Sequence, residues 1–397
     1  MIDRRQALRS LLSFAAASPL WPRLAAAAPQ RKGTVYPPTY SDEVMGPVSL
    51  HEMEEAARKK IHQMAYDFIA GGVEDELTLR ANREALTRIQ LRPRVMVDVS
   101  RIDPTLELLG QKMESPIILA PTGGKELVLP GGDRTAAQAA AATRTLYVVA
   151  SAGWKQELKG AAPVWWQNTL GQATKAAAQG FARRSADAGC SAICVTVDNQ
   201  YQSNRERNNR NRFDYGYMQT GVPEENPKRQ PLSPAVAAML QPHTPNLTWE
   251  YVDWVKGAGP LPVILKGILA AEDARLAVAR GVDAVIVSNH GGRQLDSVLP
   301  TIEALPSVVE AVEGKIPVLM DGGIRRGTDI LKALALGAKA ILIGRPYVWG
   351  LAAFGQAGVQ RVVELLRAEL VVSMGLAGKP NLAAIDRSLV RLPGEKP

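Results

Sequence analysis

The sequence Ser288-Asn289-His290-Gly291-Gly292-Arg293-Gln294-Leu295-Asp296 directly follows the apolar run Ala-Val-Ile-Val at 284–287. Four small or β-prone residues without a polar interruption are typical of a strand that is covered on both faces. The two glycines let the chain bend sharply and let its backbone approach a ligand closely. His290 and Arg293 therefore lie where a buried strand passes into a loop.

The residue types of this pair indicate a chemistry. A histidine can accept a proton near neutral pH, and an arginine offers a planar fork that matches a carboxylate. His290 and Arg293 together predict proton abstraction from a substrate that is anchored by its carboxylate. On these two residues alone, a structural histidine beside a surface arginine is the alternative.

The alternation of a short apolar run with a longer, alanine-rich helical stretch recurs along the chain. The runs are 116–120, 146–150, 164–167, 192–196, 263–266, 284–288, 317–321 and 340–344. Eight strands alternating with helices predict an α/β fold, the (β/α)8 barrel. The reactive groups of that fold gather at the carboxyl ends of the strands. Each run here ends in polar or glycine residues: Thr122-Gly123, Ser151, Gln167, Thr196 with Asp198, Lys266, His290, Asp321-Gly322-Gly323 and Gly344-Arg345.

The last two runs predict a phosphate site. The sequences Asp321-Gly322-Gly323-Ile324-Arg325-Arg326-Gly327 and Ile343-Gly344-Arg345-Pro346 place glycine amides and arginines where barrels commonly hold a phosphate. Glycines alone would be weak evidence, because any tight turn uses them.

Asp198 is a candidate partner of the histidine. It follows Thr196 by two residues, so strand alternation directs both side chains to one face. A carboxylate there can fix the tautomer of a histidine and stabilise the imidazolium that forms. A solvated carboxylate at a strand end is the alternative.

The segment 288–296 closely resembles the signature of the FMN-dependent α-hydroxy acid oxidases and dehydrogenases. The sequences at 66–76, 92–94 and 98–100 continue the resemblance, which covers about residues 48–390. It implies FMN as the cofactor, oxidation of an α-hydroxy acid to the 2-oxo acid, and a homo-oligomer. The electron acceptor, whether oxygen, a quinone or a cytochrome, stays open.

The resemblance also implies roles for single residues. His290 is the base, Asp198 orients it, and Lys266 faces the flavin N1 and C2 carbonyl, where negative charge accumulates on reduction. Arg205 and Arg293 bind the substrate carboxylate. The remaining FMN contacts are Thr122, Gly123, Ser151, Gln167, Thr196, Ser288, Asp321, Gly322, Gly323, Arg325, Gly344 and Arg345. A snorkelling lysine and a solvated charge run at 204–207 are the alternatives for Lys266 and Arg205.

The predicted substrate pocket departs from the family. Phe68 and Thr169 stand where members acting on small hydroxy acids usually carry tyrosines, and Ala152 stands near a frequent aromatic position. Loss of two phenols removes hydrogen bonds and opens space, so we do not expect glycolate or lactate to be the preferred substrate. An FMN-binding module that has lost turnover is the competing hypothesis, which the retained His290, Arg293, Asp198 and Lys266 oppose.

Composition limits the class of partner. The 397 residues carry a net charge of +8, of which +5 remains without residues 1–28. No aromatic-interleaved basic stripe or metal-ligand spacing supports nucleic-acid or metal binding. Cys190 and Cys194 would lie roughly 13 Å apart on an extended segment, too far for a disulfide, so we expect buried, small apolar residues.

Three regions flank or interrupt the predicted barrel, which spans 111–390. Residues 1–28 are typical of a twin-arginine signal peptide, with Arg4 and Arg5 before a weakly apolar stretch and an alanine run at 25–28. This predicts export to the periplasm, with an uncleaved anchor or frayed helix as the alternative. Residues 29–110 form a linker and a helical extension, with a helical run that Ala70-Gly71-Gly72 ends. Residues 203–249 form a long loop, either a mobile lid or a disordered insertion.

Changing Arg4 and Arg5 together to lysine is expected to keep the protein in the cytoplasm, because the paired arginines are the feature that the export route reads. Cell fractionation measures this. An unchanged exported fraction would contradict the twin-arginine hypothesis.

Overall fold

The computed structural model describes residues 40–150, 158, 165–171, 174–231 and 242–395. The chain divides into two units, Met1–Tyr40 and Ser41–Pro397. The expected signal peptide at 1–28 and the expected cofactor residue Ser151 lie outside the described residues.

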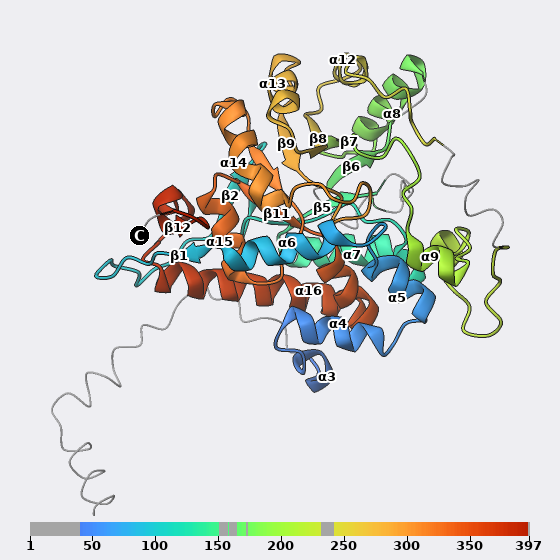
Figure 1. Cartoon of the computed structure of the whole chain (residues 1–397), viewed down its shortest axis with the longest axis horizontal. Helices are drawn as coiled ribbons and strands as arrows, with labels where there is room; N and C mark the ends of the chain where they lie inside the picture. Colours follow the sequence, from blue (N-terminus) through green and yellow to red (C-terminus); the bar gives the residue numbers. More distant parts are fainter. Residues whose placement is uncertain (1–39, 151–157, 159–164, 172–173, 232–241, 396–397) are drawn as a thin grey trace, which may run out of the picture. The chain divides into compact units, whose positions relative to one another are not determined.

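The second unit is built on a closed barrel of eight parallel strands, in the order β10-β11-β4-β5-β6-β7-β8-β9 (Figure 1). The strands are β4 (Ile117–Leu119), β5 (Leu146–Val149), β6 (Trp165–Thr169), β7 (Ala192–Thr196), β8 (Val263–Ile268), β9 (Ala284–Val287), β10 (Val318–Met320) and β11 (Ala340–Ile343). Each of the eight predicted runs overlaps one of these strands, and β6 and β8 each extend two residues beyond their runs. The (β/α)8 prediction is confirmed.

Strand alternation separates two cores. One face of each strand points into the barrel, where Ile118, Val148, Trp166, Ile264 and Leu319 belong to one buried cluster. The opposite faces pack against the surrounding helices in a second, larger cluster. Because both faces are buried, the strands are mainly apolar, as expected for a parallel sheet, and the polar residues of β6, β7 and β8 lie toward their carboxyl ends.

Helices follow the strands and surround the barrel (Figure 1). They are α7 (Gly132–Ala142), α8 (Lys175–Asp187), α12 (Glu250–Lys256), α13 (Ala271–Ala279), α14 (Thr301–Val312), α15 (Gly327–Ala335) and α16 (Arg345–Leu376), with the 3-10 turns η1 (Lys125–Leu127), η4 (Leu382–Ala384) and η5 (Arg387–Leu389). The α16 ribbon bends at Phe354 and Gly355, whose φ and ψ are not helical.

The described part of the N-terminal extension is built mainly from short helices. It contains α3 (Asp42–Met45), α4 (Leu50–Arg58), α5 (Gln63–Ala70) and α6 (Leu77–Arg88). The predicted single run is divided between α4 and α5, and it ends at Ala70 as expected. The strand β1 (Gln90–Leu91) pairs antiparallel with β12 (Val390–Arg391), and β2 (Leu106–Leu108) pairs with β3 (Gln111–Met113) before the barrel begins.

The connection between β7 and β8 is partly ordered into helix. Its described part carries α9 (Glu206–Asn211) and α10 (Tyr217–Thr220), while residues 232–241 lie outside the described residues. Cys190 and Cys194 are free and buried, which confirms their prediction. Burial raises their thiol pKa values to about 11 and about 12.

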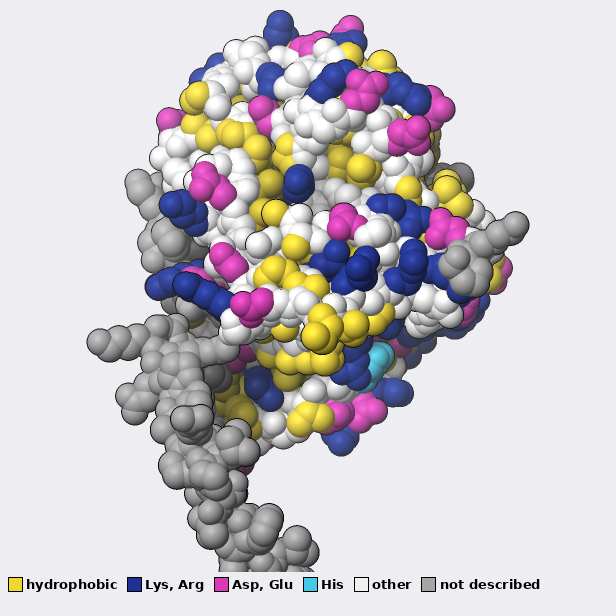
Figure 2. Space-filling model, turned by 90° about the vertical axis from the view of Figure 1, so that its left-hand side faces the viewer, with side chains coloured by type: hydrophobic (Ala, Val, Ile, Leu, Met, Phe, Trp, Pro, Cys, Tyr) yellow, Lys and Arg dark blue, Asp and Glu magenta, His cyan; other side chains and the backbone are white. Residues whose placement is uncertain are grey.

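The surface shows no single-sign stripe on the face in Figure 2. Charged side chains of both signs are interspersed there with patches of hydrophobic side chains. In the described part of the chain, no helix combines the length and apolarity needed to cross a membrane.

Candidate active site

A cavity of about 350 Å³ opens at the carboxyl ends of the barrel strands. The predicted site residues that line it are Phe68, Thr122, Gly123, Thr196, Arg205, Lys266, His290, Arg293, Asp321, Gly322, Gly323, Arg325, Gly344 and Arg345. These residues are distant in sequence, and the barrel closure brings them together.

His290 and Asp198 form the pair that the sequence predicted. The Nδ1 atom of His290 lies 3.0 Å from Oδ1 of Asp198. The backbone of His290 has a φ of 55°, a region that few side chains other than glycine adopt, and its N–H donates to the hydroxyl of Ser288. Behind the pair, a side chain at Gly267 would place its Cβ 2.8 Å from Cβ of Asp198, so a glycine is required there.

The protonation states of this pair follow from their surroundings. Burial lowers the pKa of His290 and the positive charge of Lys266 lowers it further, against the opposing effect of Asp198. Burial raises the pKa of Asp198, but His290 and Lys266 outweigh it and lower that pKa overall. At neutral pH the pair therefore holds a neutral imidazole beside an ionised carboxylate, which suits a general base.

Lys266 brings a buried positive charge to the floor of the cavity. Its Nζ atom donates to Oγ of Ser288 at 2.9 Å and lies 3.4 Å from Oδ2 of Asp321. Burial lowers the pKa of the ammonium group, and Asp321 and Asp198 more than reverse this, so the pKa is raised. Lys266 stays charged. The hydroxyl of Ser288 accepts hydrogen bonds from both the ammonium group of Lys266 and the backbone N–H of His290.

Two arginines converge over one aromatic ring. The guanidinium carbons of Arg205 and Arg293 lie 5.9 Å and 5.2 Å from the centre of the Phe68 ring. Burial lowers the pKa of both guanidinium groups, and the positive charges of Arg205 and Arg345 lower the pKa of Arg293 further. Among the described residues neither arginine forms an ion pair, so the cavity presents two uncompensated cations that favour an anion.

Arg325 and Arg345 also line the cavity. Arg345 begins α16 and donates to the carbonyls of Ile69, Gly71 and Gly291, each at 2.9 Å. Burial, together with the positive charge of Arg325, lowers the pKa of Arg345 to about 9. A helix N-terminus with adjacent arginines is a ready anion site.

The structure does not bring Gln167 and Thr169 to the cavity. Neighbouring residues of a strand point to opposite faces, and Trp166 points into the barrel. Asn168 therefore takes the inward position on β6 and lines the cavity, where its side chain accepts from Oγ1 of Thr196 at 2.8 Å. Gln167 is in register with Ile193 of the outer core, and Oγ1 of Thr169 accepts from the N–H of Gly171.

Several cavity residues were not singled out from the sequence. They are Asn199, Gln202, Tyr215, Met218 and His243, which come from the connection between β7 and β8. His243 lies 3.3 Å from the side-chain amide of Asn199 through Nδ1. No local pattern marks these residues. Only the proximity of Asn199 to Asp198 in sequence could have indicated one of them.

The residues present fit FMN. Oδ1 of Asp321 is buried without a hydrogen-bond partner in the described part of the chain, and so can accept from a ribityl hydroxyl. Gly322 has a φ of 97°, and a Cβ there would come within 2.7 Å of Thr301, so only glycine lets this loop line the cavity. Arg325 and Arg345 supply the positive charge that a phosphate needs.

Comparison with known proteins agrees with this geometry. The FMN-dependent dehydrogenase family matches residues 57–392. A peroxisomal (S)-2-hydroxy-acid oxidase of Oryza sativa subsp. japonica is 44% identical over 360 residues, covering 88% of this chain and 97% of the relative. An L-lactate oxidase of Nostoc sp. is 41% identical over 364 residues, covering 88% and 99%. The crystal structure of a mandelate oxidase has a TM-score of 0.79 at 39% identity, covering 87% and 99%.

The chain belongs to the FMN-dependent dehydrogenase family. It is an FMN-dependent oxidoreductase with a (β/α)8 fold.

Replacing Arg325 with glutamine is expected to weaken FMN binding roughly tenfold to a hundredfold, the value of one charge-assisted hydrogen bond. Riboflavin, which has no phosphate, should bind as before. Fluorescence titration of the apoprotein with both flavins measures this. Arg326→Gln is the matched control, because Arg326 pairs with Glu369 and does not line the cavity. An equal loss for both flavins would contradict a phosphate contact.

Proposed function

We propose that this protein oxidises an α-hydroxy acid, or a larger molecule that carries that group, to the 2-oxo acid. The observation that carries the proposal is that His290, which is bonded to Asp198, lines one cavity together with Arg205 and Arg293. The relatives named above as oxidases of 2-hydroxy acids, lactate and mandelate support it.

Substrate binding is assigned to the arginines. Arg205 and Arg293 enter from two loops and offer several N–H donors to one carboxylate. Their bond to an anion is strengthened because burial removes water from both guanidinium groups. The substrate carboxylate would lie near the ring of Phe68, beside both guanidinium groups. The CH–OH unit would then be directed toward His290.

Proton transfer is assigned to His290. Its Nε2 atom is the free ring nitrogen, because Nδ1 is bonded to Asp198. Nε2 accepts a proton from the CH–OH unit, and Asp198 then stabilises the imidazolium that results. FMN, when bound, supplies the acceptor of the two electrons. Thr122, Gly123, Asp321, Arg325 and Arg345 would hold it, and Lys266 keeps a fixed positive charge beside it.

A direct experiment separates turnover from binding alone. The holoprotein is mixed anaerobically with a panel of α-hydroxy acids while the flavin absorbance is followed. Bleaching with at least one of them is expected. Bound flavin that no member of the panel bleaches would favour an FMN-binding module that has lost turnover.

The base is tested by the pH dependence of flavin reduction. We expect the rate to fall on the acid side with an apparent pKa below about 6.5, the ordinary value for histidine, because burial and Lys266 lower the pKa of His290. In Asp198→Asn this acid limb should move to still lower pH, since the carboxylate raises that pKa. His290→Ala should keep FMN and lose roughly 10² to 10⁴-fold in rate. A His290→Ala variant that reduces its flavin normally would remove His290 from the mechanism.

Phe68→Tyr tests the preference for substrates other than lactate and glycolate. The added hydroxyl would lie beside the arginines and should raise kcat/KM for lactate by roughly two- to twelvefold, the value of one hydrogen bond. Thr169 is turned away from the cavity, so only Phe68 is changed. Parent and variant are compared on lactate, glycolate and mandelate. A parent that already oxidises lactate efficiently and a variant that behaves identically would contradict the idea.

A further inference from the structure

The two arginines that face the substrate belong to separate segments. Arg205 is the residue that precedes α9, and Arg293 lies in the loop after β9. Bidentate binding of a carboxylate requires their guanidinium groups to keep a fixed separation, because a small displacement of such groups costs affinity. A structural element must therefore connect α9 with the β9 loop.

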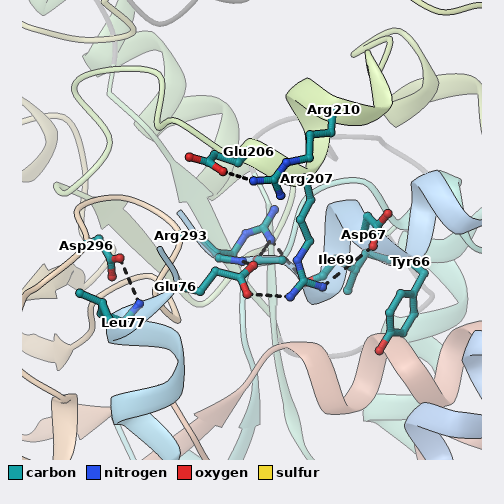
Figure 3. A network of polar contacts seen from close by, with 12 residues as sticks. Tyr66, Asp67, Ile69, Glu76, Leu77, Glu206, Arg207, Arg210, Arg293 and Asp296 are labelled. Atoms are coloured by element: carbon teal, nitrogen blue, oxygen red, sulfur yellow. Dashed lines mark hydrogen bonds and ion pairs between the residues drawn. The ribbon is translucent and has the colours of Figure 1, made fainter. Parts of the chain in front are cut away.

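Residues 71–77 join α5 to the first residue of α6, and we call them the turn 71–77. This turn forms hydrogen bonds with the β9 loop. Nη1 of Arg293 donates to the carbonyl of Gly71 at 2.8 Å, and the N–H of Val73 donates to the carbonyl of Gly292 at 3.0 Å. The N–H of Leu77 donates to Asp296 at 3.0 Å, a bond that is visible in Figure 3. The loop is therefore bound at Gly292, Arg293 and Asp296.

The same turn holds α9. The N–H of Glu74 donates to the carbonyl of Asn204, the residue before Arg205, at 2.9 Å. Nη2 of Arg207 on α9 lies 2.6 Å from Oε2 of Glu76, and Nη1 lies 3.9 Å from Asp67 (Figure 3). The turn therefore touches the neighbours of both substrate-facing arginines.

The turn has an unusual backbone that these contacts maintain. Glu74 and Glu76 have φ values of 48° and 59°, which non-glycine residues rarely adopt. Such a conformation persists where several contacts fix it. The carboxylate of Glu76 accepts from the N–H of Gly72 at 2.8 Å as well as from Arg207. Glu76 thus closes the turn and binds α9 with the same side chain.

We propose that Glu76 and Arg207 are positioning residues for the substrate carboxylate. Their ion pair ties α9 to the turn that also holds the β9 loop, and so sets the separation of Arg205 and Arg293. The inference rests on the proposed function, in which these two arginines bind the carboxylate. The pair is partly exposed, with 35% of the Arg207 side chain and 17% of the Glu76 side chain accessible to solvent. We therefore expect the ion pair to matter more for local geometry than for the stability of the whole fold.

The variants are Glu76→Gln, Arg207→Gln and the double variant. Glutamine at 76 keeps an oxygen for the N–H of Gly72 and removes the charge. Arg210→Gln is the matched control, because Arg210 lies on the same helix and pairs only with Glu206 within α9 among the described residues (Figure 3). The probe is phenylacetate, which has a carboxylate but no hydroxyl to oxidise, and its Kd is read from the change in flavin absorbance.

We expect Kd for phenylacetate to rise roughly three- to thirtyfold in each single variant, the range for coupled residues. Kd for phenylacetate in the double variant should be no higher than in the single variants, because each single variant already removes the Glu76–Arg207 ion pair. KM for an oxidised hydroxy acid should rise in parallel while kcat stays within about twofold, since the base is untouched. Arg210→Gln should match the parent.

Two results would overturn the inference. One is a Kd for phenylacetate that is unchanged in all variants. The other is a loss of phenylacetate affinity accompanied by an equal loss of FMN affinity and a lower urea midpoint, which would make the pair a general structural contact. A parent that binds no phenylacetate and whose flavin no hydroxy acid bleaches would instead overturn the proposed function, and this inference with it.

Discussion

Lys266 carries an ammonium group into the barrel, where 4% of its side chain is exposed and Asp321 is the nearest opposite charge. Removing one partner of a buried ion pair lowers the stability of the fold by roughly 3 to 5 kcal/mol, because the other charge is left buried and unpaired. Asp321 and Asp198 offset that cost and keep the lysine charged. The same charge lowers the pKa values of Asp198 and His290. The ionisation of the base therefore depends on a residue that need not touch the substrate.

This arrangement follows from the parallel barrel. The groups that surround Lys266 come from the ends of β7, β9 and β10, which together with β8 are consecutive parallel strands of the barrel. The sequence indicates this much, because apolar runs ending in polar residues predict both the strands and the shared edge. The positions of His290, Asp198, Lys266 and Asp321 were predictable for that reason.

The remaining parts of the site depend on contacts that have no local pattern. On β6 the side chain that points into the barrel is that of Trp166. Its neighbour Trp165 is equally apolar, so the sequence does not show which of the two points inward. For the same reason it does not show whether Gln167 or Asn168 faces the cavity. His243 and Tyr215 reach the cavity through a connection without apolar periodicity. In the sequence, the residues of the turn 71–77 indicate only the end of a helix. Its bond from Val73 to Gly292 joins segments more than two hundred residues apart, which no short motif records.

The C-terminal end of α5 shows why the N-terminal extension belongs to the active site. The last carbonyls of a helix lack partners within it and carry partial negative charge. Here Arg293 donates to the carbonyls of Phe68 and Ile69, and Arg345 donates to that of Ile69. Both arginines also bond to Gly71. Carbonyl dipoles hold each guanidinium in place without neutralising it as a carboxylate would. One helix end thus fixes both guanidinium groups, of which the proposed function assigns Arg293 to the substrate and Arg345 to FMN, and both stay available to an anion.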